Sequence, residues 1–444
     1  MFPIPPLLID DGLNPSAHAH HRRQRREWLM NRCDGVILLA APTHGPNQTY
    51  AWAHHYAPVY QDSYLLYLTG INQHGLIVLL DTHTNHHHIF LPDYDANRVF
   101  WEGHQFAYGD KKTHDVLECM AFTHIHSIHE LDAIIDHHGA TTQWHIPLSP
   151  TPHSHLDDHH RLHQQLRDRW GDASDVKNIV DLTWEQRWAY DTVDHENLQC
   201  GAKKTAIAFE SVLKQGPFES ETQLCGQLIG DLLKQTCYGL AFPPIVAGNH
   251  HATTLHYTSN SAALSPHDLV LMDFGLRWQT ICTDVSRTIP VSGRYTDLQR
   301  RLMGIVLETQ AATMAHVRAG VSFKELNDIG WDYMEKTLAR DFISKGGSIL
   351  RPYTRKPHNI GHLLGIQVHD GPPNRTYLNR PLAEGAMITI EPGLYGTFSL
   401  DGVTQSYGIR IEDNLQITAN GSINHTLTIP KTCDDIEAIM MASA

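Results

Sequence analysis

The first 150 residues alternate short apolar runs with stretches of helical spacing. The apolar runs are bounded by turn-forming residues and predict strands at residues 36–40, 76–81 and 88–92 and around Ile146. Helices are predicted at residues 22–31, 112–121 and 130–137. Strands that alternate with helices in this way are typical of an α/β domain.

The second part of the chain has longer helical patterns, at about 194–213 and 296–316. Two more helices are expected to begin at capping boxes, one formed by Ser220 and Gln223 and the other by Ser322 and Glu325. Short strands are predicted between and after them, at 254–257, 269–274, 282–290, 366–368, 387–391 and 408–411. Helices that flank a mainly antiparallel sheet describe an α+β domain.

A charged, histidine-rich segment at 157–175 separates the two patterns. It predicts an exposed helix followed by a linker, with the domain boundary close to Asp181. We therefore expect an N-terminal domain of residues 1–181 and a second domain of residues 182–444.

Composition narrows the class of partner. The chain has 444 residues, 41% of them hydrophobic, and no apolar run approaches a membrane span. Its formal charge of −14 argues against nucleic acid or an anionic membrane as the partner. Seven cysteines without C-x-x-C spacing indicate free thiols and a cytoplasmic location. The 34 histidines include runs at 86–88 and 137–138, which lack spaced acidic or cysteine partners and are expected to be solvated surface.

The stretch LMDFGLRWQTICTDVSRT (271–288) carries the first chemical signal. Asp273 ends an apolar strand, and a second β-like run returns past Gly275 and places Asp284 beside it. Two carboxylates about 4 Å apart repel by roughly 4 kcal/mol at an effective dielectric of about 20, so they need cations or a shared proton. This pair suggests a dinuclear metal site.

Three more residues lie at strand ends or turns in apolar surroundings: His362 in KPHNIGHLLGIQVHD, Glu391 in MITIEPG and Glu412 in YGIRIEDN. Each alone has an ordinary alternative, namely a core histidine, a satisfied strand-end acid, and a salt bridge from Glu412 to Arg410 on the same side of the strand. The whole set is much more specific than any one of its members.

This set, in the order Asp, Asp, His, Glu, Glu, resembles the metallopeptidases of the pita-bread fold, which include methionine aminopeptidase, prolidase and aminopeptidase P. The resemblance implies a curved, mainly antiparallel sheet flanked by helices, preceded by an α/β domain like those of creatinase and aminopeptidase P. It also implies that two divalent cations are bound by Asp273, Asp284, His362, Glu391 and Glu412. Of these ligands, Asp284 and Glu412 would bridge the two cations. Four carboxylates and one hydroxide carry −5 against +4 for the cations, and oxygen-rich ligation favours Mn²⁺, with Co²⁺ or Zn²⁺ as alternatives.

The resemblance extends to the reaction. A hydroxide that bridges two metals about 3.5–4 Å apart attacks the scissile carbonyl, and Glu391 passes a proton to the leaving amine. His256 in TLHY and His369 in VHD match histidines that stabilise the tetrahedral intermediate. The residues expected around the substrate pocket are His358, Arg410, Phe242 and Tyr395.

Within the family, aminopeptidase P is the best match. The residues of this chain that resemble aminopeptidase P are Arg25, Arg26, YQDSYLLYLT at 60–69 and the tail IPKTCDDIEAIM at 429–440. The expected substrates are peptides with proline at the second position, and relatives suggest a homo-oligomer, dimer or tetramer. One alternative is prolidase, which cleaves Xaa-Pro dipeptides. The motif HNIGH at 358–362 resembles the corresponding motif of prolidase. The other is a metal-free pita-bread binding module, which the complete ligand set disfavours.

Overall fold

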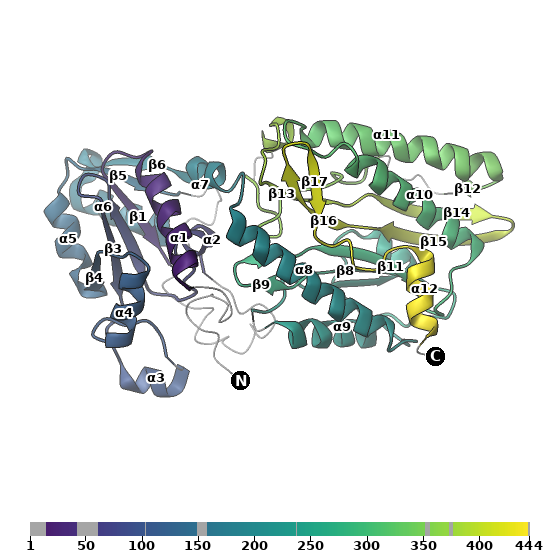
Figure 1. Cartoon of the computed structure of the whole chain (residues 1–444), viewed down its shortest axis with the longest axis horizontal. Coiled ribbons are helices and arrows are strands. Elements are labelled where there is room, and N and C mark those ends of the chain that lie inside the picture. The colour runs from purple at the N-terminus through teal and green to yellow at the C-terminus, as the bar shows by residue number, and fades with distance from the viewer. Residues whose placement is uncertain are drawn as a thin grey trace. The chain divides into compact units, whose positions relative to one another are not determined.

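A computed structural model describes residues 15–41, 61–102, 104–148, 158–236, 238–350, 356–372 and 376–442 (Figure 1). Contacts divide the chain into two compact units, Met1–Arg187 and Trp188–Ala444. The domain limit predicted after Asp181 falls inside helix α7 (Val180–Gln186). None of the helices in the described ranges is long and apolar enough to cross a membrane.

The first unit is built on a mixed sheet with strand order β4-β3-β2-β1-β5-β6. Its strands are β1 (Val36–Ala40), β2 (Ile77–Asp81), β3 (His86–Leu91), β4 (His124–Ser127), β5 (Gln143–Ile146) and β6 (Asp175–Asn178). Its helices before α7 are α1 (Pro15–Met30), α2 (Ser63–Thr69), α3 (Ala96–Glu102), α4 (Lys111–Cys119), α5 (Leu131–His138) and α6 (Asp158–Trp170). The predicted α/β pattern is confirmed, and α1 begins at Pro15 rather than at Arg22.

The arginines of α1 bind the end of α2. Arg22 donates to the carbonyls of Leu66 (2.8 Å) and Tyr67 (2.6 Å), and Arg25 donates to Tyr67 O (3.0 Å). Arg26 donates to Leu68 O (3.1 Å). The last carbonyls of a helix have no partner within it and carry partial negative charge, so these buried guanidinium groups cap α2.

Two predictions for this unit were wrong. The segment at 157–175 contains the predicted helix, but α6 is not an exposed helix, because it buries Leu162 and Leu166 in the core of the unit, and residues 175–178 form β6 instead of a linker. The histidines at 86–88 are not solvated: His87 is buried with its Nδ1 3.0 Å from Arg26 Nε, and its neighbours are half-buried. Burial, together with nearby histidines, lowers the pKa of His88 to about 3.

The second unit places antiparallel strands between two helical layers. Figure 1 shows α10 (Asp297–Met314) and α11 (Phe323–Asp341) on one side and α8 (Thr192–Leu213) and α9 (Glu221–Gln235) on the other. The strands are β7 (Ile245–Gly248), β8 (Leu269–Phe274), β9 (Arg277–Trp278), β10 (Ile281–Cys282), β11 (Val285–Pro290), β12 (Ser348–Ile349), β13 (Met387–Ile390), β14 (Gly393–Leu400), β15 (Val403–Arg410), β16 (Asp413–Thr418) and β17 (Gly421–Asn424). The capping box of Ser322 and Glu325 is confirmed at α11.

Three of the predicted strands in this unit differ from the structure. Residues 254–257 follow the 3₁₀ helix Asn249–Thr253 as a turn. Residues 366–368 form a bend, and the carbonyl of Ile366 accepts from Arg277 Nη1 (2.9 Å) instead of from a neighbouring strand. The predicted strand 282–290 is interrupted, so that Asp284 lies in the break between β10 and β11.

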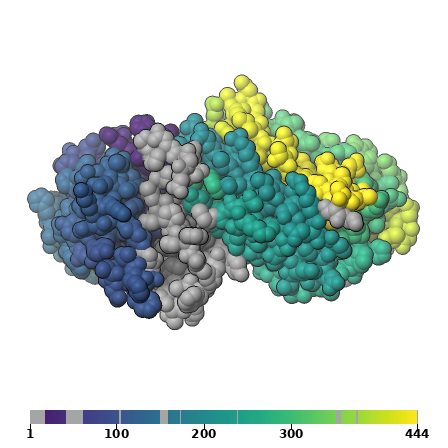
Figure 2. Space-filling view, turned by 60° about the horizontal axis from the view of Figure 1, so that its bottom comes forward, coloured from purple at the N-terminus to yellow at the C-terminus, as the bar shows by residue number. Residues whose placement is uncertain are grey.

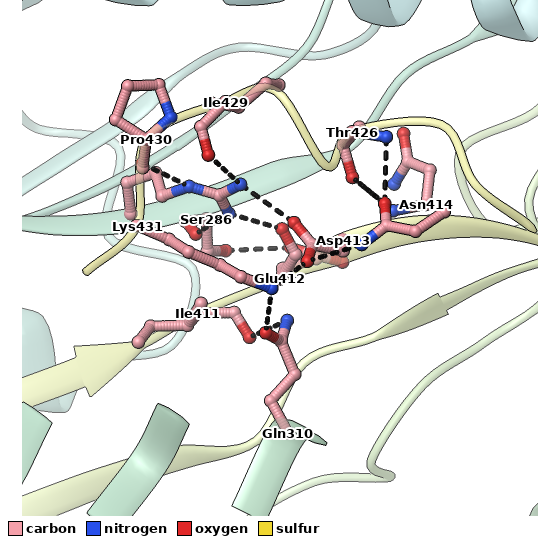
Figure 3. A network of polar contacts seen from close by, with 12 residues as sticks. Ser286, Gln310, Ile411, Glu412, Asp413, Asn414, Thr426, Ile429, Pro430 and Lys431 are labelled. Carbon is pink, nitrogen blue, oxygen red and sulfur yellow. Dashed lines mark hydrogen bonds and ion pairs between the residues drawn. The ribbon is translucent and has the colours of Figure 1, made fainter. Parts of the chain in front are cut away.

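A buried ion network fixes the segment that precedes the last helix, α12 (Cys433–Met441). In Figure 2 the yellow surface of this C-terminal part of the chain lies beside the teal helices. Figure 3 shows this network. Arg287 on β11 donates from Nη2 to Asp413 Oδ1 (2.8 Å), from Nη1 to Glu412 O (2.6 Å) and from Nε to Pro430 O (2.9 Å). Lys431 Nζ lies 2.5 Å from Asp413 Oδ2. Burial alone would raise the pKa of Asp413, but the two cations hold it below its usual range.

Asp413→Ala is expected to destabilise this unit by about 3–5 kcal/mol, because it leaves Arg287 buried without a counter-charge. Chemical denaturation followed by a signal from the second unit measures the loss. The matched control is Asp434→Ala, which removes an exposed partner of Arg300 and should cost less than about 1 kcal/mol. Equal, small losses in the two variants would contradict the argument.

Candidate metal centre

Asp273 and Asp284 are brought together by the pairing of β8 with β11. The register is antiparallel, with Phe274 opposite Val285. Only glycine fits between them, since a Cβ on Gly275 would lie 1.8 Å from the carbonyl oxygen of Thr283. The Asp284 backbone is held by the Asn414 amide, which accepts from Asp284 N (3.0 Å) and donates to Asp284 O.

His362 and Glu391 are aligned by a loop that lies along β13. Thr389 N donates to His362 O (2.9 Å), and Glu391 N donates to Ile360 O (2.8 Å). The Nδ1 of His362 lies 3.0 Å from the carbonyl oxygen of Leu363, which can only accept, so Nδ1 carries the proton. The Nε2 lone pair of His362 therefore faces the carboxylates.

The acids surround this Nε2 atom. It lies 3.4 Å from Asp284 Oδ2, 3.5 Å from Glu391 Oε1 and 3.8 Å from Glu412 Oε1. Glu412 lies between β15 and β16, where its Oε2 accepts from Ser286 Oγ (2.8 Å). Asp284, His362 and Glu412 each place a ligand atom within 4.8 Å of the others.

The cluster of Asp273, Asp284, Glu391 and Glu412 carries more negative charge than its neighbours neutralise. Burial raises the pKa of Glu391 to about 8, with a further contribution from Glu412. Burial, followed by neighbouring carboxylates, also raises the pKa of Asp284 and of Glu412 well above the usual range. One buried oxygen each of Asp273, Asp284 and Glu412 has no hydrogen-bond partner. Buried carboxylate oxygens without partners are costly, and hard divalent cations satisfy them, so the donor set fits such ions.

Arg410 supports the cluster from one side. Its Nη2 donates to Asp273 Oδ2 (2.6 Å), its Nε to Ser286 Oγ (2.8 Å) and its Nη1 to the Tyr395 hydroxyl (3.1 Å). The alternative of a salt bridge from Arg410 to Glu412 is therefore wrong. β15 ends at Arg410, and the chain beyond it no longer follows the strand alternation on which that pairing was predicted.

The other predicted pocket residues lie around the same cluster. His358 Nε2 is 3.0 Å from the Tyr395 hydroxyl, and the ring of His369 is 4.3 Å from that of His362. Phe242 lies beside Gly275, two positions after Asp273 in the chain. Burial, and then nearby Arg410, His362 and His256, lowers the pKa of His358 to about 4. His256 and His369 are exposed, whereas His358 and Tyr395 lie deeper.

Two residues that the sequence analysis missed hold this site together. Ser286 joins Glu412 to Arg410, and Asn414 holds the Asp284 backbone. Each follows a predicted ligand by two positions, Asp284 and Glu412 respectively. In a strand this spacing puts two side chains on one face, but Asp284 and Glu412 lie just before β11 and β16, so the spacing alone did not reveal these partners.

Comparisons with known proteins match both parts of the chain to families. Residues 196–419 match metallopeptidase family M24, and residues 21–145 match the aminopeptidase P N-terminal domain. Xaa-Pro aminopeptidase 3 of Rattus norvegicus is 27% identical over 98% of this chain and 87% of its own. Intermediate cleaving peptidase 55, mitochondrial, of Arabidopsis thaliana is 27% identical over 98% of this chain and 86% of its own.

Solved structures share the fold. A variant of Escherichia coli aminopeptidase P superposes with a TM-score of 0.80 at 23% identity, covering 96% of this chain and 99% of the other. Icp55 from Saccharomyces cerevisiae gives 0.81 at 23% identity, with 96% and 98% covered. The predicted pita-bread domain behind an α/β domain is confirmed.

Mn²⁺ is expected to raise the melting temperature of the 444-residue chain, and a chelator to lower it, because the cation binds only to the folded state, in which the acids are gathered. Differential scanning fluorimetry measures both shifts. Asp284→Asn combined with Glu412→Gln should abolish the response, while Asp434→Asn should keep it. If neither Mn²⁺ nor the chelator changes the melting temperature of the wild type, the proposed metal centre is contradicted.

Proposed function

We propose that this chain, which belongs to metallopeptidase family M24, hydrolyses the bond between an N-terminal residue and a proline at the second position of a peptide. The observation that carries the proposal is the convergence of the His362 imidazole with the buried carboxylates of Asp284 and Glu412, each of which has one buried oxygen without a hydrogen-bond partner. The aminopeptidase P N-terminal domain, and the relatives named Xaa-Pro aminopeptidase that span the chain, support it.

The proposed cofactor is a pair of divalent cations, held by Asp273, Asp284, His362, Glu391 and Glu412. Manganese is the first choice because the donors are mainly hard oxygens, with cobalt or zinc as alternatives. When bound, such ions supply a nucleophilic water near neutral pH and polarise the scissile carbonyl.

Glu391 is the proposed proton carrier. The nitrogen of proline leaves as an amine only when it receives a proton, and Glu391 is a buried carboxyl 3.5 Å from His362 Nε2. His256 and His369, on the exposed side of the cluster, are proposed to stabilise the oxyanion of the tetrahedral intermediate. The chain from Arg410 through Tyr395 to His358 keeps Asp273 and the wall of the pocket in place.

The bond before proline favours a dedicated site. It is a tertiary amide without an N–H, and its ring is rigid, so a protease that grips an extended backbone binds it poorly. Imidazoles and the rings of Tyr395 and Phe242 offer a pocket for the pyrrolidine.

Prolidase, the closest alternative, must bind the free carboxylate of a dipeptide. Arg410 does not serve this purpose here, because it is 4% exposed and already donates to Asp273, Ser286 and Tyr395. Longer peptides are therefore the proposed substrates. The cytoplasmic location and a homo-dimer or homo-tetramer remain proposals from the sequence.

A tripeptide Xaa-Pro-Yaa is expected to be cleaved faster than the dipeptide Xaa-Pro, since Arg410, the cation beside the carboxylates, already donates to Asp273, Ser286 and Tyr395 and is not available to a dipeptide carboxylate. The comparison is kcat/KM for the two peptides with the same Xaa in Mn²⁺ buffer. The reverse ranking would select prolidase.

His256→Ala is expected to lower kcat on an Xaa-Pro-Yaa peptide by about 10²–10³-fold, the usual effect of losing one oxyanion donor, while the metal content stays the same. The matched control is His250→Ala, an exposed histidine six positions earlier, which should leave both quantities unchanged. If the loss of activity follows loss of metal, His256 is a ligand or a structural residue instead.

A further inference from the structure

Four histidines gather on one face of the N-terminal sheet. β3 and the edge strand β4 run parallel, with His88 opposite His124 and Phe90 opposite His126. Alternate residues of a strand point to the same face, so His86 and His88 lie on the face that presents Phe90. All four imidazoles are half-buried.

Their rings are close together. The ring centroids of His88 and His124 are 4.5 Å apart and nearly parallel, and those of His86 and His124 are also 4.5 Å apart. His86, His88 and His124 each offer a nitrogen within 4.8 Å of the other two. Among the described residues, this is the one such group outside the carboxylate cluster.

Hydrogen bonds orient His88 for ligation. The Glu130 carboxylate lies 3.4 Å from His126 Nδ1, so this nitrogen donates and Nε2 of His126 is left to accept. His126 Nε2 lies 3.0 Å from His88 Nδ1, which must then donate. The Nε2 lone pair of His88 is therefore available. A ligating histidine typically donates its other ring N–H to a partner that fixes the ring, and for His88 this partner is the imidazole of His126, which Glu130 holds in turn.

We propose that His86, His88 and His124 bind a borderline divalent transition metal, with Zn²⁺ as the first choice. Imidazole ligands suit zinc, copper and nickel, whereas manganese prefers oxygen. Ligand nitrogens about 2.0–2.1 Å from zinc stand roughly 3.4 Å apart, which small rotations of these side chains achieve. Three protein ligands leave the fourth position to water. The ion would clamp the edge strand β4 to β3.

The site is independent of the proposed peptidase activity, and its test counts metal rather than turnover. The 444-residue chain is dialysed against excess Zn²⁺, and the number of zinc ions bound per chain is measured. His88→Gln combined with His124→Gln should bind one zinc fewer than the wild type. The matched pair His129→Gln with His137→Gln, two exposed histidines, should bind the wild-type number. Zinc counts that are equal in all three proteins, or an equal loss in the control pair, would overturn the proposal.

Glu130→Gln tests the orienting role of Glu130. It should weaken this one zinc site by about ten-fold, the usual effect of losing such a partner, and leave the zinc-free melting temperature unchanged. X-ray absorption of the zinc protein saturated first with Mn²⁺ provides a reading that needs no variant. A zinc shell with three imidazoles supports the site, and a shell of oxygens with a single imidazole overturns it.

Discussion

The mutual repulsion of buried carboxylates is the constraint that governs the second unit. Asp273, Asp284, Glu391 and Glu412 come from four different strand ends, and burial raises the pKa of three of them. One cation of the chain, Arg410, pairs with a member of the group, Asp273. The remaining negative charge, together with three oxygens that lack partners, is what divalent cations would balance.

The scaffold around the site keeps these acids together although they repel. Arg287 and Lys431 neutralise Asp413, the residue next to Glu412, and Arg287 also binds the Glu412 carbonyl. Ser286 and Asn414 then fix the side chain of Glu412 and the backbone of Asp284. These contacts to backbone and to buried side chains hold Asp284 and Glu412 in place within the fold.

The two histidine environments show how the same side chain is used differently. His362 is a single imidazole among carboxylates, which is an arrangement for a hard ion. His86, His88 and His124 are imidazoles without a carboxylate between them, and Glu130 acts on them only through His126. The proposed peptidase centre and the proposed zinc site therefore differ in the ion that they select.

Most strands and helices, and the residues of the main cluster, could be predicted from the sequence. Apolar runs set β1, β2, β8 and β13 within a residue or two, and the motifs around Asp273, Asp284, His362, Glu391 and Glu412 were each local enough to be recognised. A local sequence pattern contains information about residues a few positions apart. Each of these motifs is only a few residues long, so the sequence alone was enough to recognise it.

Only the tertiary structure decided which distant groups meet. Arg410 pairs with Asp273, 137 positions away, and not with Glu412, two positions away. The histidines of β3 have their partners on β4, more than thirty positions later, so no spacing within 86–88 revealed them. Strand register and the direction of each side chain fix such contacts, and both depend on the packing of the whole unit.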